Sequence, residues 1–205
     1  MHHGFKIGIL TLMVLFGTVG LSRAEENSAT LANLMTAFNG ESNAHARYLA
    51  FAQKADEEGY GQVASLFRAA AAAEKVHFGN HAKIITAMGA TPKADIAQPD
   101  VKSTKENLEA AIKGESYERD TMYPEFIAEA EKSGNKDALR SFNFAKTAEA
   151  GHANLYKEAL DNLEQQKGGK KTFYVCSVCG ATITTLPDTN CLVCNSPKET
   201  FLTID

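Results

Sequence analysis

Apolar residues recur at helical spacing in four long stretches between about residue 28 and residue 166. Steps of three and four residues place these side chains on one face of each stretch, which predicts four amphipathic helices. The first stretch ends near Gly59, the second near Gly89 and the third near Gly134, and the longest connection, which contains Pro92 and Pro99, follows the second. Short, long and short connections predict a mainly α protein, a four-helix bundle with one crossover.

The third stretch carries local signals of its own. Ser103 or Thr104 is suited to the N-cap position, and Glu106 is placed to complete a capping box. Pro124 lies inside the stretch and lacks the backbone N–H that a helix interior needs, so we expect a kink there.

Composition and charge exclude several classes of protein. The 205 residues are 44% apolar and 22% charged, as in an ordinary globular protein rather than a disordered or collagen-like chain. Lysine and arginine number 21 against 25 acidic residues, which gives a net charge of −4. We expect no nucleic-acid partner, because binding to phosphates usually needs a basic surplus.

The N-terminal segment has the pattern of a secretory signal peptide over residues 1–24. Lys6 supplies the positive start, Ile7 to Leu21 supply the apolar stretch, and Ser22-Arg23-Ala24 ends it with small residues two apart. The apolar run of about 15 residues is shorter than the roughly 20 that cross a bilayer. We therefore expect export to the periplasm without membrane attachment after cleavage, or a cytoplasmic protein if the segment is not a working signal.

Acidic residues interrupt the apolar stripe of each predicted helix. Five glutamates occupy such positions: Glu41 in the first helix, Glu74 in the second, Glu115 and Glu118 in the third, and Glu149 in the fourth. A buried carboxylate without a partner costs several kcal/mol or becomes protonated, and five that converge would repel one another. No lysine or arginine interleaves these positions, so multivalent metal ions are the most economical compensation.

The spacing of acids and histidines narrows the choice of metal. Glu74-x-x-His77 and Glu149-x-x-His152 lie on two predicted helices, and single glutamates lie on the other two. This is the ligand inventory of ferritin-like bundles that hold two iron or two manganese ions. Carboxylate-rich ligation with two imidazoles suits iron or manganese better than a structural zinc site.

Other polar residues of the stripes leave alternatives open. We expect His45 to be a hydrogen-bonded interior histidine in preference to a ligand, and His81 to be structural or solvent-facing. Tyr48 and Tyr123 fit equally well as core aromatics with satisfied hydroxyl groups and as proton or radical partners of a metal centre.

All four cysteines lie in the last thirty residues and form two C-x-x-C pairs: Cys176, Cys179, Cys191 and Cys194. Gly180 and Asn195 follow these pairs, and both residue types tolerate the positive φ that turns a backbone beneath a metal. Four thiolates admit zinc or iron, and two disulfides are the alternative in an exported protein. The spacing does not separate a zinc ribbon from a rubredoxin-type iron, but a redox-active iron would serve a neighbouring di-iron bundle as an electron source.

These patterns predict three parts of the chain. A signal peptide occupies residues 1–24, the bundle residues 25–167, and a linker with the cysteine module residues 168–205. Within the last part, Gly168-Gly169-Lys170-Lys171 has the composition of a flexible linker.

The order of motifs resembles the rubrerythrin family over about residues 28–205. The segments that carry the resemblance are Gly40-Glu41-Ser42-Asn43-Ala44, Ala73-Glu74-Lys75-Val76-His77, Lys113-Gly114-Glu115-Ser116-Tyr117-Glu118, Ala148-Glu149-Ala150-Gly151-His152 and the two cysteine pairs.

The resemblance implies a ferritin-like di-iron bundle followed by a rubredoxin-like domain with one iron on four cysteines. The implied ligands in the bundle are Glu41, Glu74, Glu115, Glu149 and His152, with Glu118 and His77 exchanging on one iron as its redox state changes. Tyr48 and Tyr123 match tyrosines that are hydrogen-bonded near the centre. Together with Glu118 as a proton relay, they are the expected catalytic residues.

The implied reaction is the reduction of hydrogen peroxide to water in defence against oxidative stress. Electrons from NAD(P)H would reach the protein through a reductase or a rubredoxin, and the implied assembly is a homodimer with one subunit's cysteine module near the other's di-iron site. A ferroxidase and iron-storage protein of the ferritin type is the competing interpretation. A third is a metal-binding electron carrier without catalysis, with zinc in the tail.

Overall fold

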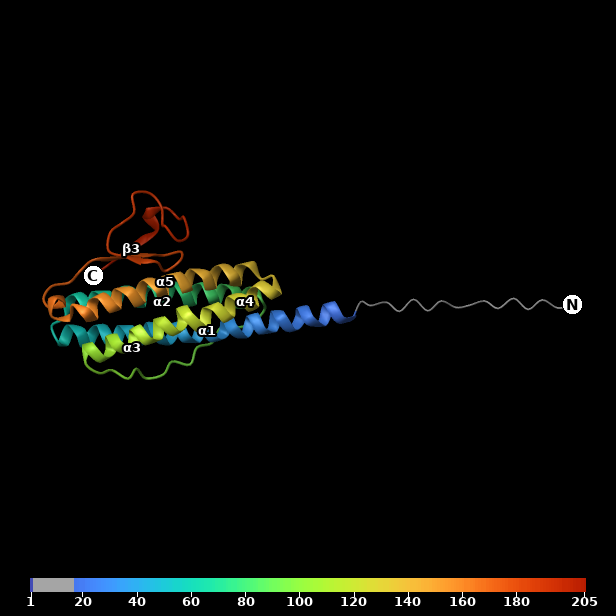
Figure 1. Cartoon of the computed structure of the whole chain (residues 1–205), viewed down its shortest axis with the longest axis horizontal. Coiled ribbons are helices and arrows are strands. Elements are labelled where there is room, and N and C mark those ends of the chain that lie inside the picture. The colour runs from blue at the N-terminus through green and yellow to red at the C-terminus, as the bar shows by residue number, and fades with distance from the viewer. Residues whose placement is uncertain (2–16) are drawn as a thin grey trace.

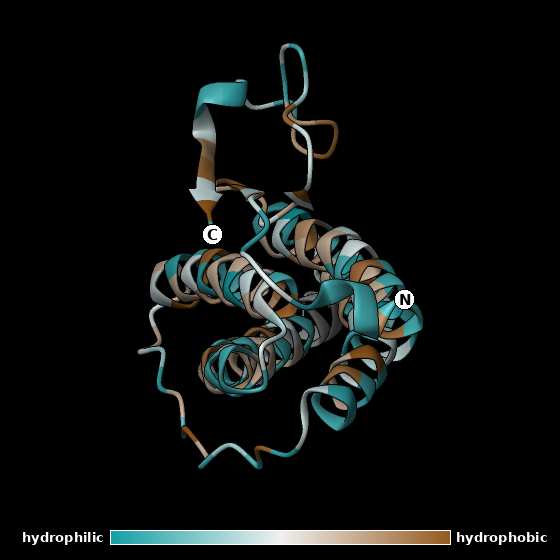
Figure 2. Ribbon diagram, turned by 90° about the vertical axis from the view of Figure 1, so that its left-hand side faces the viewer, coloured by the Kyte–Doolittle hydropathy of each residue, from teal (hydrophilic) through white to brown (hydrophobic). Residues whose placement is uncertain are grey.

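The computed structural model describes residue 1 and residues 17–205, with side chains described from Glu25 onward. Long helices lie alongside one another, and a small module with short strands rests on one side of them (Figure 1). Viewed along their axes, the helices surround a common interior (Figure 2). The predicted mainly α bundle with a small C-terminal module is confirmed.

The bundle consists of two helical hairpins joined by the long connection that the sequence predicted. Its helices are α1 (Gly17–Glu57), α2 (Gly61–Ala87), α3 (Thr104–Tyr117), α4 (Tyr123–Ser133) and α5 (Lys136–Asp161). A short 3₁₀ turn, Leu163–Gln166, follows α5. Most of the predicted signal peptide, residues 2–16, lies outside the described residues, and Ala24 lies within α1. In the part of the chain that is described, no helix combines the length and hydropathy needed to cross a membrane.

The third helical segment is divided by a π-helical turn, Glu118–Met122. Its start is as predicted, because Ser103 and Glu106 form a reciprocal capping box. At the turn, the backbone N–H of Tyr123 donates to the carbonyl of Glu118, five residues back. Pro124 then lies in the first turn of α4, where a missing N–H costs little. A π turn between two helices therefore replaces the kink that was expected within one helix.

Two apolar layers fill the bundle on either side of the acidic positions. One layer holds Tyr48, Phe51, Phe67 and Tyr156, and the other is centred on Leu34, Tyr123, Phe126 and Phe142. The α2 helix contributes a run of fully buried alanines to the first layer, and such small side chains let neighbouring helices approach closely. The candidate metal-binding side chains lie between the two layers: Glu41, Glu74, His77, Glu115, Glu149 and His152.

The cysteine module is a three-stranded antiparallel sheet with metal-binding loops. Its strands are β1 (Phe173–Cys176), β2 (Thr182–Ile183) and β3 (Phe201–Ile204), in the order β2–β1–β3. A 3₁₀ turn, Lys198–Thr200, precedes β3. Phe173 and Val175 of β1 are buried in the bundle's first apolar layer. The module therefore shares a core with the helices.

The segment between the bundle and the module is fixed to the bundle. The N–H of Gly168 donates to the carbonyl of Gly59 at 3.1 Å, and the N–H of Lys171 donates to Ser65 Oγ at 3.2 Å. A Cβ atom on Gly61 would lie 2.2 Å from the carbonyl oxygen of Gly168, so only glycine permits this approach. The segment predicted as a flexible linker, Gly168 to Lys171, is thus held by backbone contacts.

The module lies against the bundle of its own chain. Arg68 Nε donates to the backbone oxygen of Asp205 at 2.7 Å, and Asn80 Nδ2 donates to the carbonyl of Val178 at 2.9 Å. Within the chain, the module reaches the site of its own bundle. The placement of a module near a second subunit's site, which the resemblance implied, stays a prediction.

Candidate metal centres

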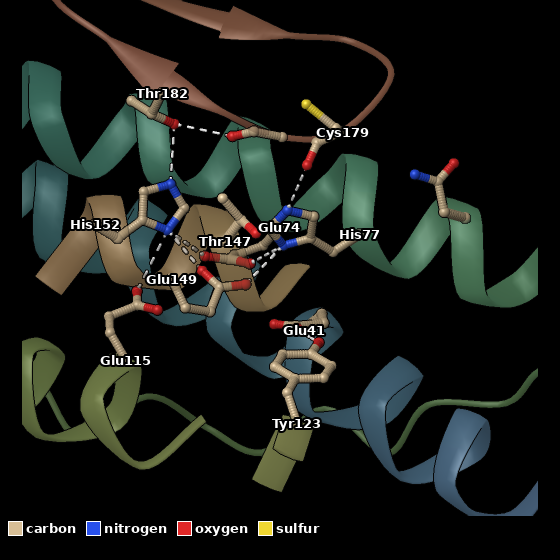
Figure 3. Close-up of polar contacts among 12 residues, drawn as sticks. Glu41, Glu74, His77, Glu115, Tyr123, Thr147, Glu149, His152, Cys179 and Thr182 are labelled. Carbon is tan, nitrogen blue, oxygen red and sulfur yellow. Dashed lines mark hydrogen bonds and ion pairs between the residues drawn. The ribbon is translucent and has the colours of Figure 1, made fainter. Parts of the chain in front are cut away.

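Six side chains from four helices converge between the two apolar layers (Figure 3). They form two groups whose ligand atoms lie within 4.8 Å of one another. The first group is Glu41, Glu74, His77 and Glu149, and the second is Glu74, Glu115, Glu149 and His152. Glu74 and Glu149 belong to both groups, so the arrangement provides two adjacent metal positions that share two carboxylates.

Each of the four carboxylates has one oxygen engaged and one without a hydrogen-bond partner. Tyr48 O–H donates to Glu115 Oε1 at 2.6 Å, and Tyr123 O–H donates to Glu41 Oε1. His77 Nδ1 and His152 Nδ1 contact the Oε2 atoms of the glutamates three residues before them, at 2.9 and 2.8 Å. The buried oxygens without a hydrogen-bond partner are Glu41 Oε2, Glu74 Oε1, Glu115 Oε2 and Glu149 Oε1. Of these, Glu149 Oε1 lies 3.0 Å from His77 Nδ1 and Glu74 Oε1 lies 3.4 Å from His152 Nδ1, within ion-pair distance.

Four buried carboxylate oxygens without a hydrogen bond are costly, and a pair of metal cations would satisfy them. Burial and the neighbouring acids, Glu118 foremost, hold the pKa of Glu41 well above its usual range. Burial and the charge of Glu149 raise the pKa of Glu115 to about 8. Without a metal, the cluster therefore takes up protons that divalent cations would displace, so the residues present fit a dinuclear centre.

The histidines also carry part of the compensating charge. Burial opposes a charged His77, but Glu149 and Glu74 outweigh it and raise the pKa of His77 to about 10. Burial likewise opposes a charged His152, but its hydrogen bonds to Glu115 and Glu149 raise its pKa well above the usual value. The Nδ1 atoms of both histidines, called the inner nitrogens below, thus lie among carboxylates, where a bound metal ion would replace the proton.

The outer nitrogens of the two histidines are held by the cysteine module. His77 Nε2 lies 3.2 Å from the carbonyl oxygen of Cys179, and His152 Nε2 lies 2.9 Å from Thr182 Oγ1. A carbonyl only accepts, so Nε2 of His77 carries the hydrogen and Nδ1 is left to face the metal.

Gly180 makes this close packing possible. Its φ of +80° lies in the left-handed region, and a Cβ atom there would lie 2.1 Å from His77 Nε2. Glycine is therefore required at this position both by the backbone turn and by the imidazole beneath it.

The four cysteines converge on a second metal site, as predicted. Their sulfur atoms lie within 4.8 Å of one another, and the shorter pairs, Cys176 with Cys194 and Cys179 with Cys191, are separated by 3.6 Å. These distances are far from the roughly 2.05 Å of a disulfide, and all four thiols are free, so the disulfide alternative is wrong.

The backbone of this site follows the expected pattern. Gly180 and Asn195 have positive φ, +80° and +59°. A hydrogen bond from Cys179 and N–H groups of the turn outweigh burial and lower the pKa of Cys176 to about 4. A deprotonated sulfur is the form that binds a metal.

The structure also places the remaining predicted residues. His45 is half-buried and its Nδ1 contacts the Ala71 carbonyl at 2.7 Å, so it is the hydrogen-bonded histidine that was expected. Of the two roles expected for His81, the structural one holds, because the residue is fully buried and its nitrogens contact Ser141 and Tyr123. Glu118 is half-buried and lies outside both ligand groups, and its role as a ligand stays a prediction.

Glu118 nonetheless lies within electrostatic reach of the centre. Burial and the charges of Glu115 and Glu149 raise its pKa well above the usual value. His77, the residue predicted to exchange with it, is the one that faces the first ligand group.

Sequence reasoning missed four residues that the fold brings to the site. Thr182 and Asn80 connect the module to the bundle, Ser141 binds His81, and Tyr156 buries a hydroxyl group that has no hydrogen-bond partner. Tyr156 lies one helical turn after His152 and so falls on the same helical face, but nothing local marks Thr182 or Ser141.

Known proteins share this arrangement. The family model described as Rubrerythrin matches residues 32–160. Nigerythrin from Nitratidesulfovibrio vulgaris is 40% identical over 174 residues, which cover 84% of this chain and 85% of that protein. Rubrerythrin-2 from Clostridium acetobutylicum is 34% identical over 187 residues, which cover 86% and 97% of the two chains.

Solved structures agree in fold. The fully reduced, all-ferrous state of nigerythrin superimposes with a TM-score of 0.78 at 39% identity, over 85% of this chain and 86% of the other. A bacterioferritin from Desulfovibrio desulfuricans gives a TM-score of 0.61 at 20% identity, over 70% and 84% of the two chains, which shows a common fold alone.

Proposed function

The chain belongs to the rubrerythrin family, with two irons in the bundle and one on the four cysteines, and from this premise we propose that it reduces hydrogen peroxide to water. The observation that carries the proposal is the contact of the two metal sites. The carbonyl of Cys179, a ligand of the single iron, lies 3.2 Å from Nε2 of His77, whose other nitrogen faces the paired site. An electron-transfer module docked on a redox centre suits an enzyme that must be reduced again after each turnover.

Each of these side chains would have its own role in such a reaction. When bound, a reduced iron pair supplies one electron from each metal to the O–O bond and stabilises the developing negative charge. Glu74 and Glu149 would hold both metals, while Glu41 and Glu115 would each hold one. Tyr48 and Tyr123 keep the second oxygens of these single carboxylates fixed and hold a proton there. Glu118, whose pKa is raised well above its usual value by burial and the neighbouring acids, would relay protons to the leaving oxygen.

An iron-storage function of the ferritin type is the competing proposal. It is supported by a bundle fold common to a bacterioferritin. Storage needs no electron-transfer module, and here the module is anchored through Gly168, Cys179 and Thr182. The peroxidase therefore accounts for more of the chain.

The test is anaerobic reduction of the iron-loaded protein, followed by one equivalent of peroxide, with both iron signals recorded. Rapid oxidation of the paired site is expected in the normal protein and is lost in Glu149→Ala, which lacks a shared ligand. Cys179→Ser should spare the first oxidation and slow the return of electrons. An oxidation of normal rate in Glu149→Ala would contradict the proposal, and peroxide-independent uptake of many irons per chain would favour storage.

Partners and location follow as further proposals. We infer an external electron donor, a rubredoxin or a reductase linked to NAD(P)H, and a homodimeric assembly. We also infer export after cleavage behind Ala24, which would require a donor outside the cytoplasm. The mass of the mature protein and its solution mass by light scattering test the cleavage and the assembly.

A further inference from the structure

A row of hydrogen bonds leads away from the metal centre through the second apolar layer. Tyr123 O–H donates to Glu41 Oε1, and His81 Nε2 lies 3.3 Å from the Tyr123 oxygen. Ser141 Oγ lies 2.9 Å from His81 Nδ1. The four residues come from α1, α4, α2 and α5, so the row crosses the bundle rather than following one helix.

The surroundings of the row are dry. Tyr123 and His81 are 0% exposed, and the ring of Phe142 lies 6.0 Å and 5.5 Å from theirs, measured between centroids. A proton that travels here must therefore pass along the side chains themselves.

The direction of each bond can be derived. Glu41, ionised as a metal ligand, only accepts, so Tyr123 donates its single proton to it and accepts from Nε2 of His81. Burial and the charge of His77 lower the pKa of His81 to about 3, so the ring is neutral and Nδ1 is an acceptor. Ser141 must then donate to Nδ1. All three donors point toward Glu41.

The outer end of the row meets a cavity. Ser141 lines a space of about 540 Å³ at the junction of α2, α5 and the cysteine module. Asn80, Lys83, Arg140 and Cys194 form other parts of its wall. The space opens to solvent and its wall combines apolar residues with Asn80, Lys83, Asp137 and Arg140, so water from outside can enter it and supply protons to the serine.

We propose that Ser141, His81 and Tyr123 form a proton wire that carries protons from this cavity to the Glu41 side of the metal centre. The proposal rests on the proposed function, because the reduction of one hydrogen peroxide to two waters consumes two protons and two electrons. The electrons come from the reduced metals, and the row would supply protons through the apolar layer in addition to those relayed by Glu118.

Each passage balances. A water in the cavity gives a proton to the oxygen of Ser141, whose own proton moves to Nδ1 of His81. The Nε2 proton moves to the oxygen of Tyr123, and Tyr123 releases its proton beside Glu41. One proton enters and one leaves, which leaves His81 with its hydrogen on Nδ1, and a tautomer exchange through the doubly protonated ring returns the hydrogen to Nε2 before the next passage.

The kinetic test compares the normal protein with His81→Ala, His81→Gln and Ser141→Ala, and with His45→Gln as a matched control. His45 is a histidine of the same bundle, bound to the Ala71 carbonyl and without a hydrogen bond to the side chains of the row. Each protein is loaded with iron, its iron content is measured, and the reduced form is oxidised with peroxide in H₂O and in D₂O. Both His81 variants should react at least about tenfold more slowly, within the range of a lost proton-transfer group.

Two features separate a proton wire from a packing role. Added imidazole should restore the rate of His81→Ala, because it fits the space left by the side chain, but should not affect His45→Gln. The solvent isotope effect should rise in Ser141→Ala and both His81 variants. Normal rates and unchanged isotope effects in variants with full iron content would overturn the wire.

A readout independent of activity is the tautomer of His81. Nitrogen-15 NMR of the zinc-loaded protein should show a hydrogen on Nε2 and none on Nδ1. A hydrogen on Nδ1, or a charged ring at neutral pH, would overturn the direction derived above. If the reduced normal protein failed to react with peroxide, the peroxidase would be contradicted, whereas the tautomer would still test the wire.

Discussion

The outer nitrogen of His77 and the carbonyl oxygen of Cys179 lie 3.2 Å apart and join the two metal sites through one hydrogen bond. Cys179 contributes a sulfur to one site, and the inner nitrogen of His77 faces the other. The path between the sites thus consists of one residue's backbone and one imidazole ring. Its geometry depends on the glycine that follows the cysteine.

Substitution of Gly180 should separate the two sites. Gly180→Ala places a methyl group against His77 and strains a backbone at φ +80°, so the module should lift from the bundle and electron return should slow at least tenfold. Stopped-flow reduction measures this rate. Gly134→Ala is the matched control, because Gly134 has a φ of +68° with nothing within 4 Å of an added Cβ. It should lose only about 1 kcal/mol of stability to backbone strain. Equal electron-transfer rates in the two variants would show that the contact is unimportant.

Thr182 should influence the affinity of the bundle for metal. Thr182→Val removes the partner of His152 Nε2, and loss of such an orienting contact typically weakens metal binding 10- to 100-fold. Thr182→Ser keeps the hydroxyl group and should bind iron normally. Competition with a chelator gives the two affinities, and a normal value for Thr182→Val would refute this role.

The shared carboxylates should be needed for both bundle irons. Glu149→Ala removes a ligand from both groups, so the iron content should fall from three to one per chain, with the visible spectrum of the four-cysteine site retained. Glu158→Ala, an exposed glutamate of the same helix, should keep all three. Elemental analysis counts the irons. Retention of two bundle irons in Glu149→Ala would be incompatible with a shared ligand.

The metal-free protein should lose stability as pH rises. His77 has a pKa of about 10 in the fold against an ordinary 6.5, so its contribution is complete below pH 6.5 and is lost toward pH 10. Glu115 has a pKa of about 8 against 4.5, and its protonated form likewise ceases to contribute as pH rises through 8. In the iron-loaded protein, the metal ions neutralise the carboxylates in place of these protons.

Thermal unfolding of the metal-free and the iron-loaded protein between pH 6 and 9 therefore tests this pH dependence. The gap in Tm between the iron-loaded and metal-free proteins should widen with pH, and the metal-free Glu115→Gln variant should show a shallower dependence. A gap that is constant or narrows would contradict the proton-for-metal exchange.

Much of the centre could be predicted because its ligands are local in sequence. Glutamate and histidine three residues apart lie on one helical face, so the E-x-x-H pairs at Glu74 and Glu149 fix the facing direction of two helices at once. The positive φ values of Gly180 and Asn195 followed from residue type alone.

The rest depends on contacts between distant segments. The row from Ser141 to Tyr123 joins residues of three helices, and no spacing rule links them. The anchoring of Gly168 to the α1–α2 turn uses backbone groups, which the composition of a glycine-rich segment does not reveal. The π turn at Glu118 inserts one residue into a pattern that otherwise continues as a helix.

Coverage of the outer nitrogens of His77 and His152 by the module closes one side of the buried carboxylates. Glu115 and Tyr123 lie on the side away from the module (Figure 3). In the proposed peroxidase, oxidant and water would therefore pass on the side of Glu115, while electrons from the sulfur ligands would arrive from the opposite side. Turnover would then need no movement of the module away from the two histidines.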